Sequence, residues 1–202
     1  MVCMRAQSPP IPSSPPGYLF MGARDSQLVL EVFYDNLCYG SAMNWPVFSQ
    51  AISKFSNRSL GVIIHIFPLP YHRNSFLAAW AGETILKASP SKFPVFMSYI
   101  FQYYKEFISQ SVNLTELEVM DKYAAYAEKY VEIDYDIIME GYQNLYNNLN
   151  ARYAWKYACS RGVSGTPTFF ANGVVVPNAS EFSYYNWSNF IQKFIQASGN
   201  MI

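Results

Sequence analysis

The chain has 202 residues and a formal net charge of zero, with 14 Lys and Arg against 14 Asp and Glu. Hydrophobic residues make up 51% of it and charged residues 14%, which excludes a disordered chain, since that class combines low hydrophobicity with high net charge. Without a basic excess, we expect no nucleic-acid partner. The length predicts one core, and the 18% aromatic content leaves open that some aromatic surface faces a protein partner.

The three cysteines, Cys3, Cys38 and Cys159, are odd in number and widely separated. They do not support the disulfide framework of a small secreted domain, so the sequence predicts a reducing, cytoplasmic location. The N-terminal stretch has no apolar run like that of a signal peptide, and no segment reaches the roughly 18 apolar residues that span a bilayer. Two histidines and three scattered cysteines match no metal-ligand spacing, so we expect no metal and no membrane span.

The predicted elements begin after a proline-rich lead-in. Residues 1–22 contain serines and closely spaced prolines, which predict an extended tail. Residues 28–34 (LVLEVFY) are β-branched and aromatic and predict a buried strand. From Ser41 onward apolar residues recur every three or four positions, which indicates a helix, and residues 60–67 (LGVIIHIF) predict a second strand. Residues 23–72 therefore predict a βαβ unit.

Residues 73–160 show only helical periodicity. The spacing predicts four helices, over residues 74–88, 93–107, 115–130 and 136–159. Thr115 and Glu118 have the spacing of a capping box, which indicates the start of the third of these helices. We therefore expect an all-helical insertion between two parts of a sheet.

The last part of the chain, residues 161–202, returns to the period of a strand. Two short apolar runs surround Asn172 and Gly173, which is a strong signal for a hairpin. A final helix is predicted from apolar residues between Trp187 and Ile195, ending near Gly199. The whole order is βαβ, a helical block, then ββα.

Three local motifs accompany this order. Residues 35–41 (DNLCYGS) stand where a strand ends and a helix begins, residues 67–72 read FPLPYH, and residues 161–173 read RGVSGTPTFFANG. Together they resemble the DsbA-like branch of the thioredoxin superfamily, over residues 28–194. The resemblance implies an α/β class protein with a thioredoxin-like fold and a helical insertion. The family's Cys-x-x-Cys motif is here Cys-x-x-Ser.

The resemblance also implies the site. Cys38 takes the position of the family's nucleophilic thiol and Ser41 that of the second cysteine, so these are the candidate catalytic residues. Tyr39, Gly40, Thr166 and Pro167 are the candidate substrate-binding residues, with Pro167 expected in the cis form. A helix N-terminus favours a thiolate, and Ser41 is a candidate donor of a hydrogen bond to it.

The serine at position 41 leaves the function open. In a Cys-x-x-Cys enzyme the second thiol resolves the mixed disulfide, and serine cannot do so. One interpretation is a monothiol oxidoreductase that acts on peptide or protein thiols, with glutathione as a co-substrate and no resident cofactor. The alternative is a redox-inactive binding or assembly module. A weaker alternative is a kappa-type glutathione transferase, which has serine at the nucleophile position.

The remaining cysteines and histidines have simpler interpretations. Cys3 falls in the tail, and Cys159 is expected to be a half-buried structural thiol rather than a partner of Cys38. His65 lies within a predicted strand, so a hydrogen-bonded histidine of the sheet is expected. His72 is the better functional candidate because it begins the connection into the insertion, although a packing or capping role is favoured.

Overall fold

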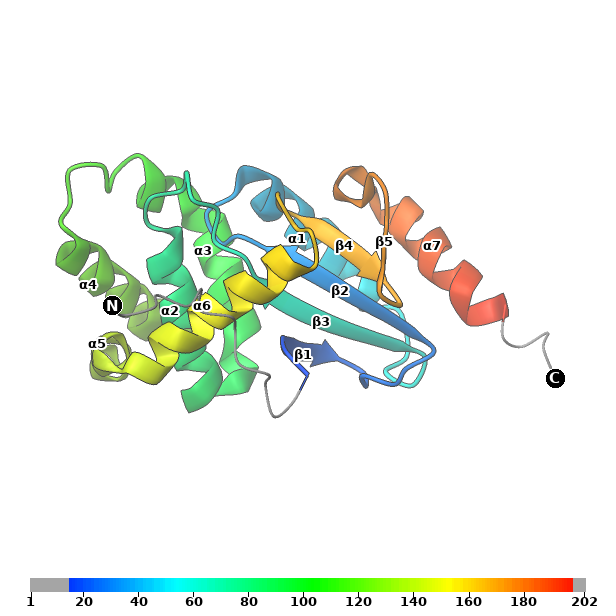
Figure 1. The fold of residues 1–202 in the computed structure, drawn as a ribbon, viewed down its shortest axis with the longest axis horizontal. Helices are drawn as coiled ribbons and strands as arrows, with labels where there is room; N and C mark the ends of the chain where they lie inside the picture. The colour runs from blue at the N-terminus through cyan, green and yellow to red at the C-terminus, as the bar shows by residue number, and fades with distance from the viewer. Residues whose placement is uncertain (1–14, 198–202) are drawn as a thin grey trace, which may run out of the picture.

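The computed structural model describes residues 15–197 and contains one five-stranded sheet with helices on both faces (Figure 1). The strand order is β1-β3-β2-β4-β5. Strand β2 (Leu28–Tyr34) pairs in parallel with β3 (Leu60–Ile66) and antiparallel with β4 (Thr168–Ala171). Strand β5 (Val174–Val175) completes the expected hairpin with β4. The predicted thioredoxin-like α/β fold is confirmed.

The prediction that residues 1–22 form an extended, poorly packed tail without helix or strand is wrong at its end. Tyr18–Met21 forms strand β1, which pairs antiparallel with β3 at the sheet edge. The ring of Tyr18 packs against Phe93 and that of Phe20 against Trp45, so aromatic packing outweighs the proline-rich composition nearby. Residues 1–14, the rest of the predicted tail, lie outside the described residues.

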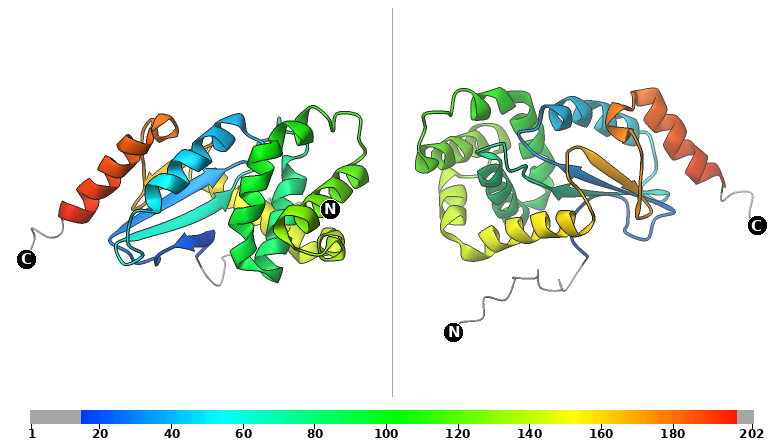
Figure 2. Two further views of the ribbon diagram at one scale, coloured as in Figure 1. Left: turned by 180° about the vertical axis from the view of Figure 1, so that it is seen from behind. Right: turned by 45° about the horizontal axis from the view of Figure 1, so that its top comes forward.

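The two faces of the sheet have different covers. Helix α1 (Tyr39–Ile52) and helix α7 (Tyr184–Ala197) cover one face, where Phe48, Phe169 and Trp187 pack together in the main core. Helix α6 (Leu145–Ser160) crosses the other face, as the two views of Figure 2 also show, over a smaller cluster around Phe33 and Phe170. Cys38 packs against this smaller cluster.

The insertion between β3 and β4 is helical, as predicted, but its boundaries differ. It contains α2 (Ser75–Ala88), a 3-10 turn (Pro90–Lys92), α3 (Phe93–Ile108) and α4 (Glu116–Tyr126), followed by a π-helical turn (Ala127–Val131), α5 (Tyr135–Gln143) and α6. Apart from the long α6, these helices gather beyond one end of the sheet, whereas α7 lies toward the other (Figure 1).

The single helix predicted for residues 136–159 is in fact two. The chain breaks at Asn144, whose side-chain oxygen accepts hydrogen bonds from the amides of Tyr146 and Asn147 and so caps α6. An asparagine in a polar, helix-like stretch gives little periodic signal for such a break. The capping box of Thr115 and Glu118 is present as expected.

The last helix begins earlier than the apolar residues that predicted it. Helix α7 begins at Tyr184, before the first of the apolar residues that indicated it, and a 3-10 turn at Ala179–Glu181 precedes it. The predicted end near Gly199 lies outside the described residues. In the part of the chain described, no helix is both long and apolar enough to cross a bilayer.

Candidate functional site around Cys38

Cys38 lies between the end of β2 and the start of α1. It is the residue immediately before the helix, and its carbonyl accepts the hydrogen bond of the Ala42 amide at 2.9 Å. The helix begins at Tyr39, two residues earlier than predicted, so the turn after β2 is shorter and the thiol stands at the helix N-terminus. The Cys38 side chain is half-buried, and no disulfide joins it to Cys159.

The loop before β4 faces Cys38. The thiol donates a hydrogen bond to the carbonyl oxygen of Thr166, with 3.3 Å between sulfur and oxygen, and the Thr166–Pro167 peptide bond is cis. A methyl group added at Gly40 would lie 3.3 Å from Pro167 Cδ and from the Thr166 oxygen, closer than ordinary contact. The structure therefore brings together four of the predicted residues, Cys38, Gly40, Thr166 and Pro167, and a side chain at position 40 would require its neighbours to shift by a few tenths of an ångström.

Ser41 is close in sequence but turned elsewhere. Its side chain is buried, and its hydroxyl oxygen accepts a hydrogen bond from the Asp35 amide at 3.4 Å. Within the described chain it makes no hydrogen bond to the Cys38 sulfur, so the expected donation to a thiolate is not seen. Serine here supports the turn that precedes Cys38.

Tyr39 presents its ring to solvent at the rim of a groove. The groove has a volume of about 750 Å³ and lies between α1 and α3, with Met43, Trp45, Phe101 and Tyr104 among its lining residues. Tyr39 is 64% exposed and Met43 51% exposed. An apolar surface of this kind, beginning one residue from the thiol, can hold an aromatic or aliphatic side chain of a peptide.

Asp35, which the sequence places in the turn after β2, is a buried carboxylate. One of its oxygens accepts hydrogen bonds from the Leu37 amide at 2.9 Å and from the Ser75 hydroxyl. The other accepts from the Leu69 amide at 2.9 Å and from His72 Nδ1 at 2.6 Å. The carboxylate therefore ties the Cys38 turn to the connection after β3 and to the start of α2.

His65 and His72 both pair with carboxylates. His65 lies in β3, almost without exposure, and its Nε2 is 3.0 Å from Glu31, as expected for a hydrogen-bonded histidine of the sheet. Burial lowers the pKa of His65, and the hydrogen bond to Glu31 offsets this only in part. His72 is partly exposed and pairs with Asp35 beside the candidate site, so the histidine singled out in FPLPYH does lie near Cys38.

Glu31 has a second partner. Burial opposes its ionisation, but hydrogen bonds from His65 and Arg161, together with their charges, outweigh burial and lower its pKa to about 2. Arg161 Nη1 and Nη2 each lie 3.2 Å from Glu31 Oε1, and Nη1 also bonds the Tyr157 hydroxyl. This arginine comes from the segment RGVSGTPTFFANG, so the same segment supplies both the cis-proline and the cation that pairs with Glu31 of β2.

Two other features lie away from Cys38. Cys159 is exposed near the end of α6, not half-buried as predicted, because it falls on the outer side of that helix.

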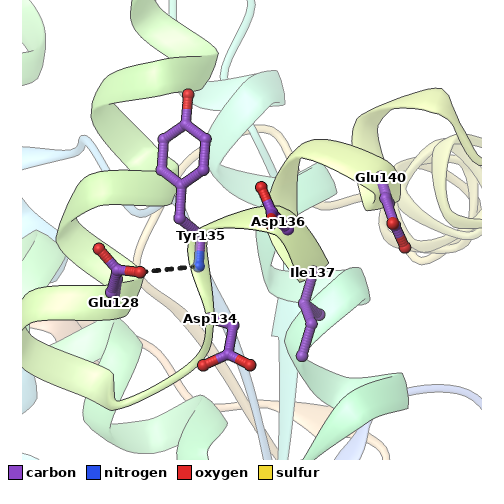
Figure 3. A pocket seen from close by; sticks show the side chains of 6 residues that line it. All are labelled: Glu128, Asp134, Tyr135, Asp136, Ile137 and Glu140. Atoms are coloured by element: carbon purple, nitrogen blue, oxygen red, sulfur yellow. Dashed lines mark hydrogen bonds between the residues drawn. The ribbon is translucent and has the colours of Figure 1, made fainter.

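A second hollow of about 480 Å³, shown in Figure 3, is lined by four carboxylates of the insertion, Glu128, Asp134, Asp136 and Glu140. It shares no lining residue with the groove at Tyr39. Among residues 15–197, no three His, Cys, Asp or Glu side chains are grouped as metal ligands.

Comparisons with known proteins identify the family of this chain and solved structures of similar fold. The family model described as Thioredoxin matches residues 15–193, whereas no curated protein matches. A candidate protein-disulfide isomerase from Pseudomonas syringae superposes with a TM-score of 0.71 at 19% identity, covering 85% of this chain and 96% of that one. BdbD from Bacillus subtilis gives 0.70 at 18% identity, covering 89% and 93% respectively.

A variant of α-DsbA1 from Wolbachia pipientis also superposes, with a TM-score of 0.70 at 16% identity, over 92% of this chain and 93% of that one. At such identities the structural neighbours show the fold alone. The family model covers nearly the whole described chain. The chain belongs to the thioredoxin family and has the fold of its DsbA-like branch.

Proposed function

We propose that the protein is a monothiol thiol-disulfide oxidoreductase in which Cys38 is the nucleophile. The observation that carries this proposal is the position of the thiol: at the N-terminus of α1, half-buried, and 3.3 Å from the Thr166 carbonyl beside the cis-proline. Unpaired amides at a helix start stabilise a thiolate, which is the reactive form. The structural neighbours BdbD and α-DsbA1 share the fold that presents such a thiol.

The proposed exchange has two steps. The Cys38 thiolate attacks one sulfur of a peptide or protein disulfide, forms a mixed disulfide, and releases the other sulfur as a thiolate. The thiolate of glutathione then attacks the substrate sulfur of the mixed disulfide, which forms a glutathione-substrate disulfide and returns Cys38 as a thiolate. Glutathione is needed because Ser41, buried and bonded to Asp35, offers no second thiol.

We further propose that the groove at Tyr39 holds the polypeptide side of the substrate. Its aromatic and methionine lining suits an apolar side chain near the reacting cysteine, and Lys105 is the single charged residue among those that line it. A reducing, cytoplasmic setting fits this cycle, because glutathione keeps thiols reduced there. No resident cofactor is needed for either step.

A redox-inactive binding module is the second candidate, favoured by the same groove together with the buried Ser41. The two functions differ in whether Cys38 is needed. The test is turnover of a peptide disulfide in the presence of glutathione, measured by release of the free peptide thiol. Cys38→Ser should abolish turnover, whereas Cys159→Ser, which removes the exposed thiol of α6, should leave it unchanged.

Equal turnover by the wild type and Cys38→Ser would remove the oxidoreductase proposal. Retained peptide binding without any turnover would favour the binding module. A chlorodinitrobenzene-type acceptor, added in parallel with glutathione, tests for the weaker kappa-type transferase, and we expect no conjugate from it.

A further inference from the structure

Asp35 holds the Cys38 turn through hydrogen bonds of its backbone and of its side chain. Its backbone carbonyl accepts from the Cys38 amide at 3.1 Å, and its amide donates to Ser41. Its carboxylate accepts from four donors, none of its surface being exposed. When this carboxylate is ionised, its negative charge belongs to the same short turn that carries the thiol, since the Cys38 amide bonds the Asp35 carbonyl.

His72 is the one donor to Asp35 whose charge can change. The other three donors are the amides of Leu37 and Leu69 and the hydroxyl of Ser75, all of them neutral. With two protons, the imidazole makes the pair neutral as a whole. With one, it still donates from Nδ1, but the pair keeps a net charge of −1. A negative charge near a thiol disfavours the thiolate.

The nearby groups of Tyr123, Tyr71 and Arg73 do not change the net charge of the Asp35 and His72 pair. Tyr123 of α4 is fully buried, and burial first, then nearby groups that include Asp35, raise its pKa well above the usual value, so it stays neutral. Tyr71 stacks edge-on with His72 and is exposed. The guanidinium of the adjacent Arg73 bonds the carbonyls of Val112 and Leu114 instead.

We propose that Asp35 and His72 form one positioning pair for Cys38, in which Asp35 fixes the turn that carries the thiol and the charge of His72 decides whether the buried carboxylate opposes the thiolate. Both act through Cys38 and neither needs to touch the substrate. The inference rests on the proposed function, since it concerns the thiol that we take as the nucleophile. It adds a control on reactivity that does not come from the Cys-x-x-Ser motif itself.

The test compares His72→Lys with His72→Gln. Both variants retain Asp35, and the partly exposed position 72 accommodates a long side chain, but only lysine carries a positive charge. The readout is the initial rate of Cys38 alkylation by iodoacetamide at pH 6, measured on the Cys38 peptide by mass spectrometry. The exposed Cys159 is an internal reference in each sample, and Arg73→Gln is the control for loss of a neighbouring positive charge that does not pair with Asp35.

We expect Cys38 to react about tenfold faster in His72→Lys than in His72→Gln, while Cys159 reacts equally in both. Arg73→Gln should stay within about twofold of the wild type. Equal Cys38 rates in the two His72 variants would overturn the proposal. If His72→Lys does not fold, Asp35→Asn replaces it, because removal of the negative charge must also make Cys38 faster than in His72→Gln; a purely structural role would slow it.

Alkylation needs no turnover, so the two proposals fail separately. A rate difference between the His72 variants in a protein without peptide turnover would keep this inference and remove the oxidoreductase. Normal turnover with identical alkylation rates would do the reverse.

Discussion

One carboxylate within strand β2 and another directly after it each pair with a histidine, and the two pairs have different surroundings. Glu31 meets His65 beneath α6 and also receives Arg161, whose charge is permanent. Asp35, four residues later, lies at the end of the strand beside Cys38 and receives only His72 and three neutral donors. Because Glu31 is paired with a permanent charge, we expect it to contribute to stability. Because Asp35 is paired with a titratable imidazole, it can also affect the reactivity of the neighbouring thiol.

Substitution of Phe33, which lies between Glu31 and Asp35 in the sequence, should have the largest effect on stability. Phe33 is fully buried, stacks on His65 with 4.4 Å between ring centres, and packs edge-on against Phe170. Phe33→Ala should lower the free energy of unfolding by about 3–5 kcal/mol, because it leaves a cavity beneath α6. Urea denaturation measures this, and Phe33→Leu, which fills most of the space, should recover the larger part. A loss below about 1 kcal/mol would show that the pairs do not depend on this packing.

The pair around Glu31 should govern acid stability. Its pKa falls from the usual 4.5 to about 2 on folding, so its contribution is complete above pH 4.5 and is lost as the pH falls toward 2. Glu31→Gln should cost about 1–2 kcal/mol at pH 7 and flatten the decline of stability across that window. Thermal unfolding from pH 7 to pH 2 measures both.

Glu31→Gln has a matched control and an outcome that would contradict its assigned role. Glu132→Gln, at an exposed carboxylate paired with Lys92, should leave the pH dependence as in the wild type. If Glu31→Gln slowed Cys38 alkylation as strongly as His72→Gln, the distinction between the two pairs would be lost.

The smallest effect is expected from a single donor to Asp35. Ser75 is buried at the first residue of α2 and donates to the same Asp35 oxygen as the Leu37 amide. Ser75→Ala should cost about 1 kcal/mol, because the carboxylate keeps its other three donors. Ser109→Ala, at an exposed hydroxyl that donates to the Lys105 carbonyl in the last turn of α3, is the matched control and should change little. A cost near zero for Ser75→Ala would mean that Asp35 is less tightly held than its contacts indicate.

Much of the fold could be predicted from hydrophobic periodicity. The buried strands β2 and β3 and the long insertion helices have strong patterns, because each buries one face or both. Strand β1 could not, since four residues after a proline-rich stretch carry almost no periodic signal and its packing on Phe93 and Trp45 is a tertiary effect. The break at Asn144 was missed for a similar reason, as its cap depends on a local side-chain conformation.

The candidate site, like the fold, could be predicted only in part. The motif around Cys38 and the segment with Pro167 could be located by resemblance, and the contact between Cys38 and Thr166 brings them together. The role of Asp35 could not, because Leu69, His72 and Ser75 meet it only after the chain has folded. A carboxylate directly after a buried strand and three residues before the candidate nucleophile was the available signal. The inward turn of Ser41 had no signal of its own.

The most direct test of Cys38 as the nucleophile is intact-protein mass spectrometry after mixing with a peptide disulfide, with and without glutathione. The wild type should form a mixed disulfide on Cys38 that persists until glutathione removes it, since no second thiol stands at position 41. Ser41→Cys should instead clear it without glutathione and retain a disulfide between positions 38 and 41. A wild type that forms no adduct, or forms it equally after Cys38→Ser, would contradict a working thiol at this site.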